Sequence, residues 1–215
     1  MIVWSEMTAK QEHSLKTVFF ASTSYPKDAK DWKSVFIRQL LKALAESQQV
    51  RIGYWGPPGD VPPQVEYTCL EKETSWLAWL MNQGGVAHLL RQKESRRFFV
   101  ILKLIQYLFS AYRRHEEYEI FHINWLQNAI PLWRTKKPAL VTVFGNDFGL
   151  LKKPGMTTLL RYVLKRRSCV IAPNAEWMVP ELKKRFGDIA HVVTVPLGID
   201  EDWYGVKRDV SFETN

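Results

Sequence analysis

The sequence predicts an α/β fold, a single doubly wound domain with about seven mainly parallel strands and helices on both faces of the sheet. Short runs rich in Val, Ile and Phe alternate with longer segments of helical periodicity, as expected when strands and helices follow one another. The later runs are apolar throughout, which is typical of parallel strands buried on both faces. Together these observations favour a Rossmann-like architecture.

The first half of the chain begins with a strand, because residues 17–21 are apolar, rich in β-formers and followed by Ser22. Residues 34–46 carry apolar side chains at helical spacing, with Arg38 and Lys42 on the other face. Strands are predicted at 50–55, which is stopped by a Gly-Pro-Pro-Gly turn, and more weakly at 65–70. A helix over 74–92 is divided or bent at Gly84-Gly85, and the strongest helical pattern covers 96–117.

The second half alternates more regularly. Strands are predicted at 118–123, 139–144, 169–172 and 191–195, and helices at 157–167 and 177–186, with Pro131 in or just before another helix. Glycine or proline follows several of these segments, at Gly145, Gly187 and Pro196. We therefore divide the chain into a poorly ordered extension (1–16), the Rossmann-like domain (17–203) and the start of a linker (204–215).

Composition excludes several classes of protein. The chain has 215 residues, of which 46% are hydrophobic and 24% charged, so it is neither disordered, nor a coiled coil, nor collagen-like. Thirty basic against 22 acidic residues give a net charge of +8. This excess suits an acidic or phosphate-bearing ligand or an anionic membrane face, and plain solubility accounts for it equally well.

Cysteine usage and missing motifs restrict location and chemistry. Cys69 and Cys169 form no Cys-x-x-Cys pair, which favours small core residues in a reducing compartment and hence a cytoplasmic protein. No secretion signal is expected in the first sixteen residues, and the apolar run 98–109 is too short and polar to span a bilayer. No dinucleotide fingerprint, phosphate loop, nucleophile elbow or metal-ligand spacing is found. We therefore expect no cofactor, no metal and no nucleic-acid partner.

The loops that follow the predicted strands contain the candidate binding residues, because open parallel sheets bind ligands at the carboxyl ends of their strands. These loops combine hydrogen-bonding groups, aromatic faces and glycines, as a sugar site requires. The candidates are Ser22, Ser24, Tyr25, Lys27 and Trp32 after the first strand, Asn124 and Trp125 after the fourth, Gly145, Asn146 and Asp147 after the fifth, and Gly198 after the last. The alternative is that the Asn and Asp residues only form turns and caps. His122, inside a strand, fits a core histidine and a functional one equally well.

Four segments carry a resemblance to a known family, in the right order and spacing. His122-Ile-Asn-Trp-Leu126 and Val141-Thr-Val-Phe-Gly-Asn-Asp147 resemble the strand-and-loop motifs of family 4 retaining glycosyltransferases. Val170-Ile-Ala-Pro-Asn-Ala175, followed by a helix with Glu181-Leu182, and Val195-Pro-Leu-Gly-Ile-Asp200 are similar to two later motifs of that family. The resemblance covers roughly residues 17–203.

The resemblance implies a GT-B fold, in which two Rossmann-like domains face a cleft. This chain resembles only the first domain, which mainly holds the acceptor, and it ends where the linker to the second would begin. It implies the acceptor-binding half of an enzyme that moves a sugar, with retention, from a nucleotide-sugar co-substrate to a glycan, a lipid-linked or another hydroxyl acceptor, and that is inactive alone. The missing second domain is then a partner, and a truncated chain is the expected explanation.

Two positions depart from the family pattern. The first loop has no glycine and contains Trp32, Lys27 and Lys30, as in a subset of bacterial members. Phe144 stands where many members have a histidine that touches the donor sugar, so that role is not transferred. No catalytic residue is assigned. The alternative function is a non-catalytic carbohydrate- or partner-binding module with a Rossmann-like sheet.

Basic residues flank the apolar run 98–109. Arg91, Lys93, Arg96 and Arg97 precede it, and Arg113 and Arg114 follow it. Such flanks could bind anionic headgroups at the inner face of a membrane. Packing of the apolar stripe in the core is expected in any case, and charged ends that are merely solvated are the alternative.

Overall fold

The computed structural model describes residues 15–86, 88 and 96–198. Within this part, seven strands form one sheet in the order β3-β2-β1-β4-β5-β6-β7, and every neighbouring pair is parallel. The strands are β1 (Lys16–Ala21), β2 (Val50–Trp55), β3 (Glu66–Tyr67), β4 (Ile120–Asn124), β5 (Ala139–Val143), β6 (Cys169–Pro173) and β7 (His191–Val192). The predicted α/β fold, with its seven strands, is confirmed.

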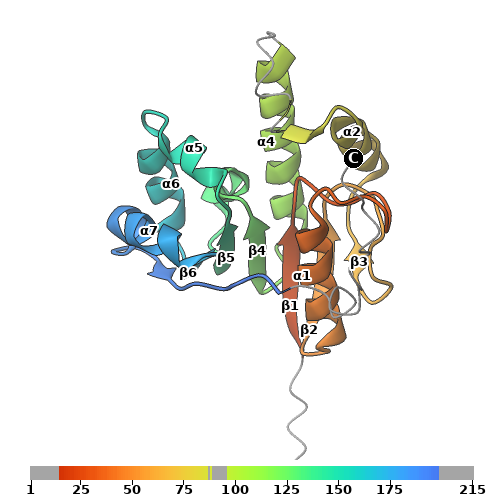
Figure 1. The fold of residues 1–215 in the computed structure, drawn as a ribbon, viewed down its shortest axis with the longest axis horizontal. Helices are drawn as coiled ribbons and strands as arrows, with labels where there is room; N and C mark the ends of the chain where they lie inside the picture. The colour runs from red at the N-terminus through yellow and green to blue at the C-terminus, as the bar shows by residue number, and fades with distance from the viewer. Residues whose placement is uncertain (1–14, 87, 89–95, 199–215) are drawn as a thin grey trace, which may run out of the picture.

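Helices connect these strands and cover the sheet on both faces (Figure 1). They are α1 (Val35–Glu46), α2 (Glu71–Asn82), α4 (Arg96–Arg114), α5 (Asp147–Leu151), α6 (Met156–Leu164) and α7 (Val179–Phe186), with 3-10 helices η1 (Leu126–Arg134) and η2 (Glu176–Met178). The described part contains no helix long and apolar enough to cross a membrane.

The chain begins in the middle of the sheet. Val18 in β1 pairs with Ile52 of β2 on one side and with Ile120 of β4 on the other. From β1, the following strands of the first half are added on one side, up to β3 at one edge of the sheet. The strands of the second half are added on the other side, from β4 to β7 at the opposite edge. The point where the direction of building reverses lies between β1 and β4, which is where an open parallel sheet binds ligands.

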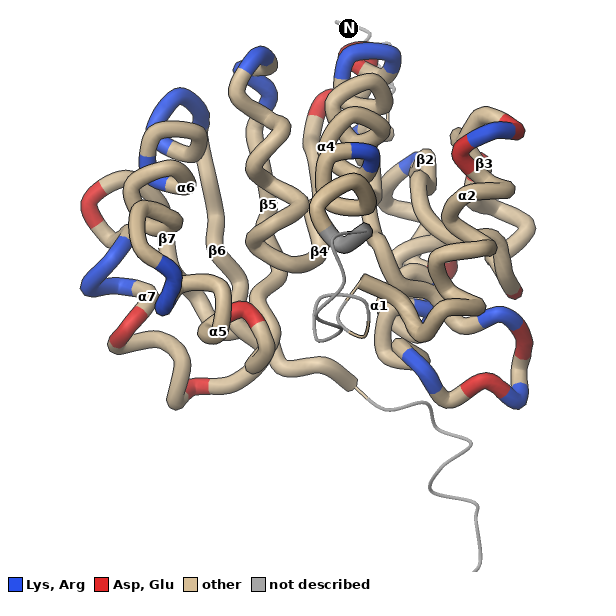
Figure 2. The backbone as a smooth tube through the Cα atoms, turned by 90° about the horizontal axis from the view of Figure 1, so that it is seen from above, with Lys and Arg blue, Asp and Glu red and all other residues tan. Residues whose placement is uncertain are grey.

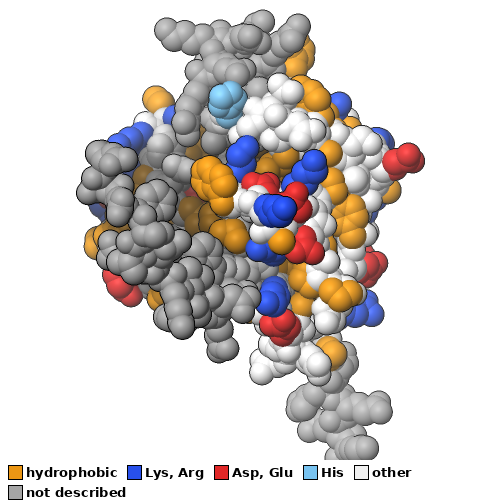
Figure 3. Space-filling view, turned by 45° about the vertical axis from the view of Figure 1, so that its right-hand side comes forward, with side chains coloured by type: hydrophobic (Ala, Val, Ile, Leu, Met, Phe, Trp, Pro, Cys, Tyr) orange, Lys and Arg blue, Asp and Glu red, His pale blue; other side chains and the backbone are white. Residues whose placement is uncertain are grey.

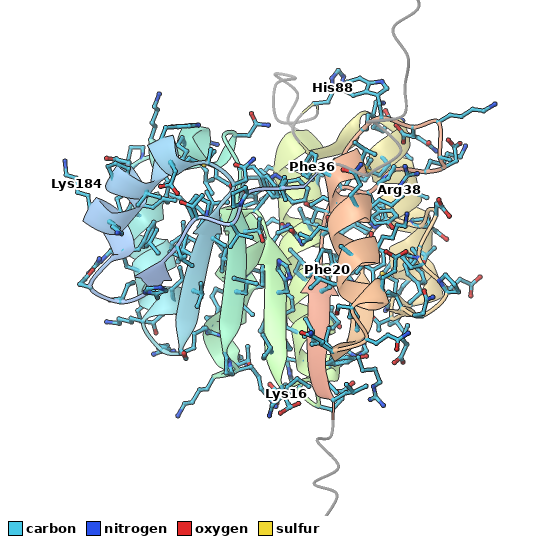
Figure 4. The ribbon with its side chains drawn as sticks, turned by 60° about the horizontal axis from the view of Figure 1, so that its bottom comes forward. Lys16, Phe20, Phe36, Arg38, His88 and Lys184 are labelled. Atoms are coloured by element: carbon cyan, nitrogen blue, oxygen red, sulfur yellow. The ribbon has the colours of Figure 1, made fainter. Side chains whose placement is uncertain are left out.

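The two faces of the sheet are covered unequally. On one face, Phe19, Phe121 and Val141 belong to a large buried cluster with residues of α2, α4, η1, α6 and α7. On the other face, Phe20 and Ile52 belong to a smaller cluster beneath α1. In Figure 4, α1 lies in front of the strands near its own end of the sheet, and no other described helix lies on that face.

Several boundaries differ from the predictions. The predicted strand 65–70 shortens to Glu66–Tyr67, and the last strand ends at Val192 instead of 195. The helix predicted from 74 starts at Glu71, where Glu73 supports its N-terminus, and ends at Asn82, because Gly84 and Gly85 adopt positive φ angles. The helix predicted to 117 ends at Arg114, and α5 was not predicted. Residues 87 and 89–95, which include Arg91 and Lys93, lie outside the described residues, as do 1–14 and 199–215.

The apolar stripe of α4 is only partly core, which corrects the expectation that all of it packs against the sheet. Leu108 and Tyr112 are buried, whereas Phe98 and Leu102 are 62% and 47% exposed. The reason is length: 19 helical residues extend about 28 Å, but the five residues of β4 extend only about 17 Å. The first turns of α4 therefore extend beyond the sheet, and in Figure 1 they rise above the other described elements.

Candidate functional site

The loops after β4 and β5 are joined by the carboxylate of Asp147. One carboxylate oxygen accepts a hydrogen bond from the Leu126 N–H (2.9 Å), and the other accepts one from the Phe144 N–H (2.8 Å). Asp147 is 1% exposed, and this burial raises the pKa of its carboxyl group to about 7 although both N–H donors act in the opposite direction. Asp147 thus holds two loops together from beneath, in the turn-forming role that was the alternative to ligand binding.

The loop after β4 is tied to β1 by two buried asparagines. The Asn124 side chain donates to the Ala21 carbonyl (3.1 Å), and the Asn128 side chain donates to the Asn124 carbonyl (2.7 Å) and to Thr23 Oγ1 (3.1 Å). The Oδ1 atoms of both asparagines are buried and have no hydrogen-bond partner among the described residues. These two acceptors lie at the reversal point between β1 and β4. Asn124 was predicted as a site residue and Asn128 was not. The signal that could have indicated Asn128 is its position four residues after Asn124, in η1 directly after the strand.

Three aromatic side chains, from the ends of β4 and β5 and from α1, form a cluster on the face covered by α1. The Trp125 ring centroid is 5.0 Å from that of Phe144, and the Phe36 centroid is 5.0 Å from Phe144 and 6.4 Å from Trp125. Phe144 is buried, whereas Trp125 and Phe36 are part-exposed. Trp125 adopts a positive φ angle of 67°, which turns the chain sharply at the end of β4. Phe36, on α1, was not predicted as a site residue, because nothing in its own segment distinguishes it from a core position.

The first loop divides into a buried part and an exposed part. Ser22 is buried and donates to the Ser24 carbonyl (2.6 Å), and Ser24 contacts Ser34 through their hydroxyls. Tyr25 is also buried, donating to the Asp60 carbonyl (2.9 Å), and this burial raises the pKa of its phenol. The side chains of Ser22 and Tyr25 therefore shape the loop from inside.

Charged residues of both signs cover the outer part of the first loop. Lys27, Lys30 and Lys33 alternate with Asp28 and Asp31 along the chain (Figure 2). Figure 3 shows basic and acidic side chains intermixed on this side of the molecule. Asp31 accepts hydrogen bonds from the N–H groups of Lys27 and Lys33, and the Lys27 contact is the largest cause that lowers the pKa of Asp31. A shallow pocket of about 490 Å³ includes Tyr25 and Lys27 in its lining. Trp32, which lies between Asp31 and Lys33 in this segment, is 79% exposed.

The loops after β5 and β6 add an exposed surface. Gly145 and Asn146 are exposed, unlike the buried Asp147 that follows them. Trp177 is 64% exposed and its ring centroid is 5.2 Å from that of Phe148. The sequence-predicted candidates thus fall into a buried scaffold (Ser22, Tyr25, Asn124, Asp147) and groups open to a ligand (Trp125, Gly145, Asn146). Trp177 was not predicted, although an exposed Trp in a loop that follows a strand is itself a signal.

Gly198 lies on the face covered by α1, next to the aromatic cluster, because Phe36 lines the same hollow. This hollow, of about 690 Å³, lies between α1, strands β4 to β6 and the segment 195–198. His122 and Thr142 lie at its base, with 2.8 Å between His122 Nε2 and Thr142 Oγ1. Burial lowers the pKa of His122 to about 4, so its imidazole is neutral at pH 7. Of the two interpretations of His122, this hydrogen bond and burial favour a satisfied core histidine.

The described residues contain no group of three or more His, Cys, Asp or Glu side chains placed to hold a metal ion. Cys69 and Cys169 are free, and burial raises the pKa of their thiols to about 11 and about 12. In comparisons with known proteins, no family model and no curated protein matches this chain.

Proposed function

We propose that this chain is the acceptor-binding half of a retaining glycosyltransferase, which transfers a sugar from a nucleotide diphosphate to a glycan, lipid-linked or other hydroxyl acceptor. A parallel α/β fold hosts many functions, so the proposal depends on the site and not on the fold. On this proposal the chain works with a nucleotide-sugar co-substrate and a second domain, in the cytoplasm.

One observation carries the proposal. Three of the segments that resemble the glycosyltransferase motifs lie at the carboxyl ends of neighbouring strands, β4, β5 and β6. Asn124, Asp147 and Asn174 in these segments therefore lie at the same edge of the sheet. Their polar and aromatic groups therefore gather where such a sheet binds ligands. The matched residues could instead have been dispersed over helices, and then no common surface would support the resemblance.

The chemistry of this edge suits a sugar hydroxyl acceptor. Trp125 and Phe36 offer apolar faces for ring carbons, while Asn146 and the exposed backbone at Gly145 offer hydrogen-bonding groups. Asp147 has a positioning role, because its carboxylate fixes the backbone on both sides of the aromatic cluster. The resemblance implies that the departing diphosphate of the donor takes the acceptor proton, so no nucleophile is needed from this chain.

Ligand-observed saturation-transfer NMR on the 215-residue chain tests the proposal, using a panel of oligosaccharides and a panel of nucleotide-sugars. We expect millimolar or tighter binding of at least one oligosaccharide, and about tenfold weaker binding in Trp125→Leu, which keeps apolar volume but removes the flat face. The matched control is Trp133→Leu, since Trp133 is 40% exposed on η1 and its ring lies edge-on to that of Phe109 in α4.

Two outcomes would count against the transferase. If the chain binds no oligosaccharide, the assignment of an acceptor site to it is wrong. Oligosaccharide binding by the chain, combined with no sugar transfer by the gene product that contains it, assigns the chain to the non-catalytic carbohydrate-binding class. Transfer assays with radiolabelled nucleotide-sugars distinguish these cases.

A further inference from the structure

The first turns of α4 form an exposed apolar surface, which we call the α4 tip (residues 98–102). Phe98, Phe99 and Leu102 are 62%, 72% and 47% exposed. Isolated exposed apolar residues are ordinary, but three within two helical turns form a patch of the kind that marks an interaction surface. Val100 is part-buried and packs against the core, and Leu104 is the first fully buried residue among the α4 side chains that the structure describes. Phe98, Phe99 and Leu102 therefore form the exposed side of the tip, which takes no part in the packing of the sheet.

The α4 tip lies at the carboxyl edge of the sheet. A helix that connects two parallel strands runs opposite to them, so α4 begins at the edge where the strands end. Figure 1 shows this beginning rising above the other described elements, and in Figure 4, where β1 rises from Lys16, α4 lies behind the sheet. The tip is thus accessible from outside, on the same edge as the loop cluster around Trp125.

The surroundings of the tip have the composition of a membrane interface. Lys103 Nζ lies 5.5 Å from the ring centroid of Trp76 and 5.6 Å from that of Tyr107, so its ammonium group is in cation–π contact with both rings. The ring centroid of Trp79, which is 44% exposed, lies 6.3 Å from that of Trp76. Trp, Tyr and Lys beside exposed Phe and Leu are the side chains that concentrate at the boundary between headgroups and acyl chains.

Charge distinguishes an anionic bilayer from other occupants. Every charged residue of α4 is basic, and the whole chain carries a net charge of +8. A second copy of the same surface would place like charges opposite each other, whereas anionic headgroups attract them. Arg114, at the other end of α4, is bonded to the buried Glu73 at 2.7 Å and does not belong to this surface.

We propose that the α4 tip is a membrane-contact surface that inserts Phe98, Phe99 and Leu102 into the interfacial layer of an anionic lipid bilayer. The insertion turns the carboxyl edge of the sheet, with Trp125 and Gly145, toward the membrane. A ligand of that edge would then be one presented at a lipid surface. The proposal concerns the contact itself and holds whatever the loop cluster binds.

Vesicle co-sedimentation of the whole chain tests it, with phosphatidylcholine vesicles and with vesicles that also contain phosphatidylglycerol. We expect binding to the anionic vesicles at about 0.05 M salt, weakening at about 0.5 M, and much weaker binding to the neutral ones. The double variant Phe98→Ser/Phe99→Ser should bind anionic vesicles roughly tenfold or more weakly, because it removes the inserted apolar area. Tyr162→Ser is the matched control: Tyr162 is an exposed aromatic on α6, beside Lys165 and Arg166, and its loss should leave binding unchanged.

A spin label gives a second measurement that does not depend on losing binding. Phe99→Cys and Tyr162→Cys are labelled with a nitroxide in a chain whose native cysteines, the part-buried Cys69 and the buried Cys169, are replaced by alanine. On anionic vesicles, the label at position 99 should become accessible to dissolved oxygen and protected from a water-soluble relaxant, and the label at 162 should not.

Three results would overturn the proposal. They are no binding of the unmodified chain to anionic vesicles at low salt, equal binding by the double serine variant, and a label at position 99 that stays in water. Sedimentation velocity without lipid covers the competing occupant: a dimer that the double serine variant dissociates would assign the tip to self-association.

Discussion

The carboxylate of Asp147 accepts a hydrogen bond from the backbone N–H of Leu126, 21 residues earlier in the chain, at 2.9 Å. This bond joins the end of β4 to the end of β5 at the edge where we place the ligand. A residue that sequence analysis selected for contact with a sugar therefore acts first on the backbone beneath it.

Substitution of Asp147 should show this structural role. Asp147→Asn places an amide N–H₂ where a carboxylate oxygen now accepts from Leu126 or Phe144, so one of the two buried N–H groups loses its acceptor. We expect the free energy of unfolding in urea to fall by about 1–3 kcal/mol at pH 7. Asn146→Ala, at the exposed neighbouring position, should change it by less than about 0.5 kcal/mol. Equal effects would contradict the assignment.

The same carboxyl group makes stability depend on pH. Its folded-state pKa is raised to about 7 from 3.8, so the folded state retains a proton that the unfolded state releases. The stability that this proton contributes is complete below about pH 4 and is lost as the pH rises to about 7, with a slope of up to about 1.4 kcal/mol per unit. Urea unfolding at several pH values should show the unmodified chain losing stability relative to Asp147→Asn across this window. A constant difference would contradict the raised pKa.

His122 should make stability depend on pH in the opposite direction to Asp147. Its pKa is lowered to about 4 by burial, so the neutral imidazole is favoured in the folded state. Its contribution to stability is present above about pH 6.5 and is lost as the pH falls toward 4. Nitrogen-15 NMR of the imidazole should show His122 neutral from pH 8 down to about pH 5. A midpoint near pH 6.5 would mean that its ring is solvated.

The pair formed by Glu73 and Arg114 should be important for stability. Glu73 is fully buried and accepts from Arg114 (2.7 Å), from the Trp55 indole N–H (3.1 Å) and from the Leu70 N–H (3.1 Å). Glu73→Ala leaves the buried Trp55 indole N–H, the part-buried Leu70 N–H and a guanidinium without this acceptor, so we expect the free energy of unfolding to fall by about 3–5 kcal/mol. Glu71→Ala, exposed in the same helical turn, is the control, and a similar loss there would contradict the special role of Glu73.

The isolated chain should transfer no sugar. On the proposed function, groups on both walls of a cleft stabilise the leaving diphosphate, and this chain supplies only one wall. Incubation with radiolabelled nucleotide-sugars and acceptors should give no product, and calorimetry should show weak nucleotide-sugar binding. Turnover, or micromolar affinity, would contradict this division of labour.

The sheet was predictable because its strands are short apolar runs, and an apolar composition alone predicts that such a run is buried. The strand at Val50–Trp55 coincides with its prediction, and residues 139–143 follow theirs to within one position. α5 was not predictable, since Asp147 and Gly149 signal a turn and the helix depends on contacts with η1. The exposure of Phe98 also could not be predicted, because periodicity gives the face of a helix but not the length of the sheet beneath it.

The candidate site was predictable as a location but not as a set of roles. Post-strand position alone placed Asn124, Trp125 and Gly145 at one edge. Whether each side chain points into the protein or toward a ligand depends on hydrogen bonds across loops, such as the one between Asn128 and Thr23, which join residues far apart in sequence. Sequence analysis has no access to such pairs.

The order of the strands has a consequence for how the chain folds during synthesis. Val18 of β1 pairs with Ile120 of β4, so about a hundred further residues must be made before β1, an interior strand, gains its second neighbour. At about 5–20 residues per second, a bacterial or eukaryotic ribosome needs several seconds for that length. Throughout that interval β1, with Phe19 and Phe20, has an open edge that other nascent chains can pair with. The residues between 22 and 119 thus set a waiting time, and a chaperone that binds extended apolar segments has its natural substrate in the N-terminal half of this protein.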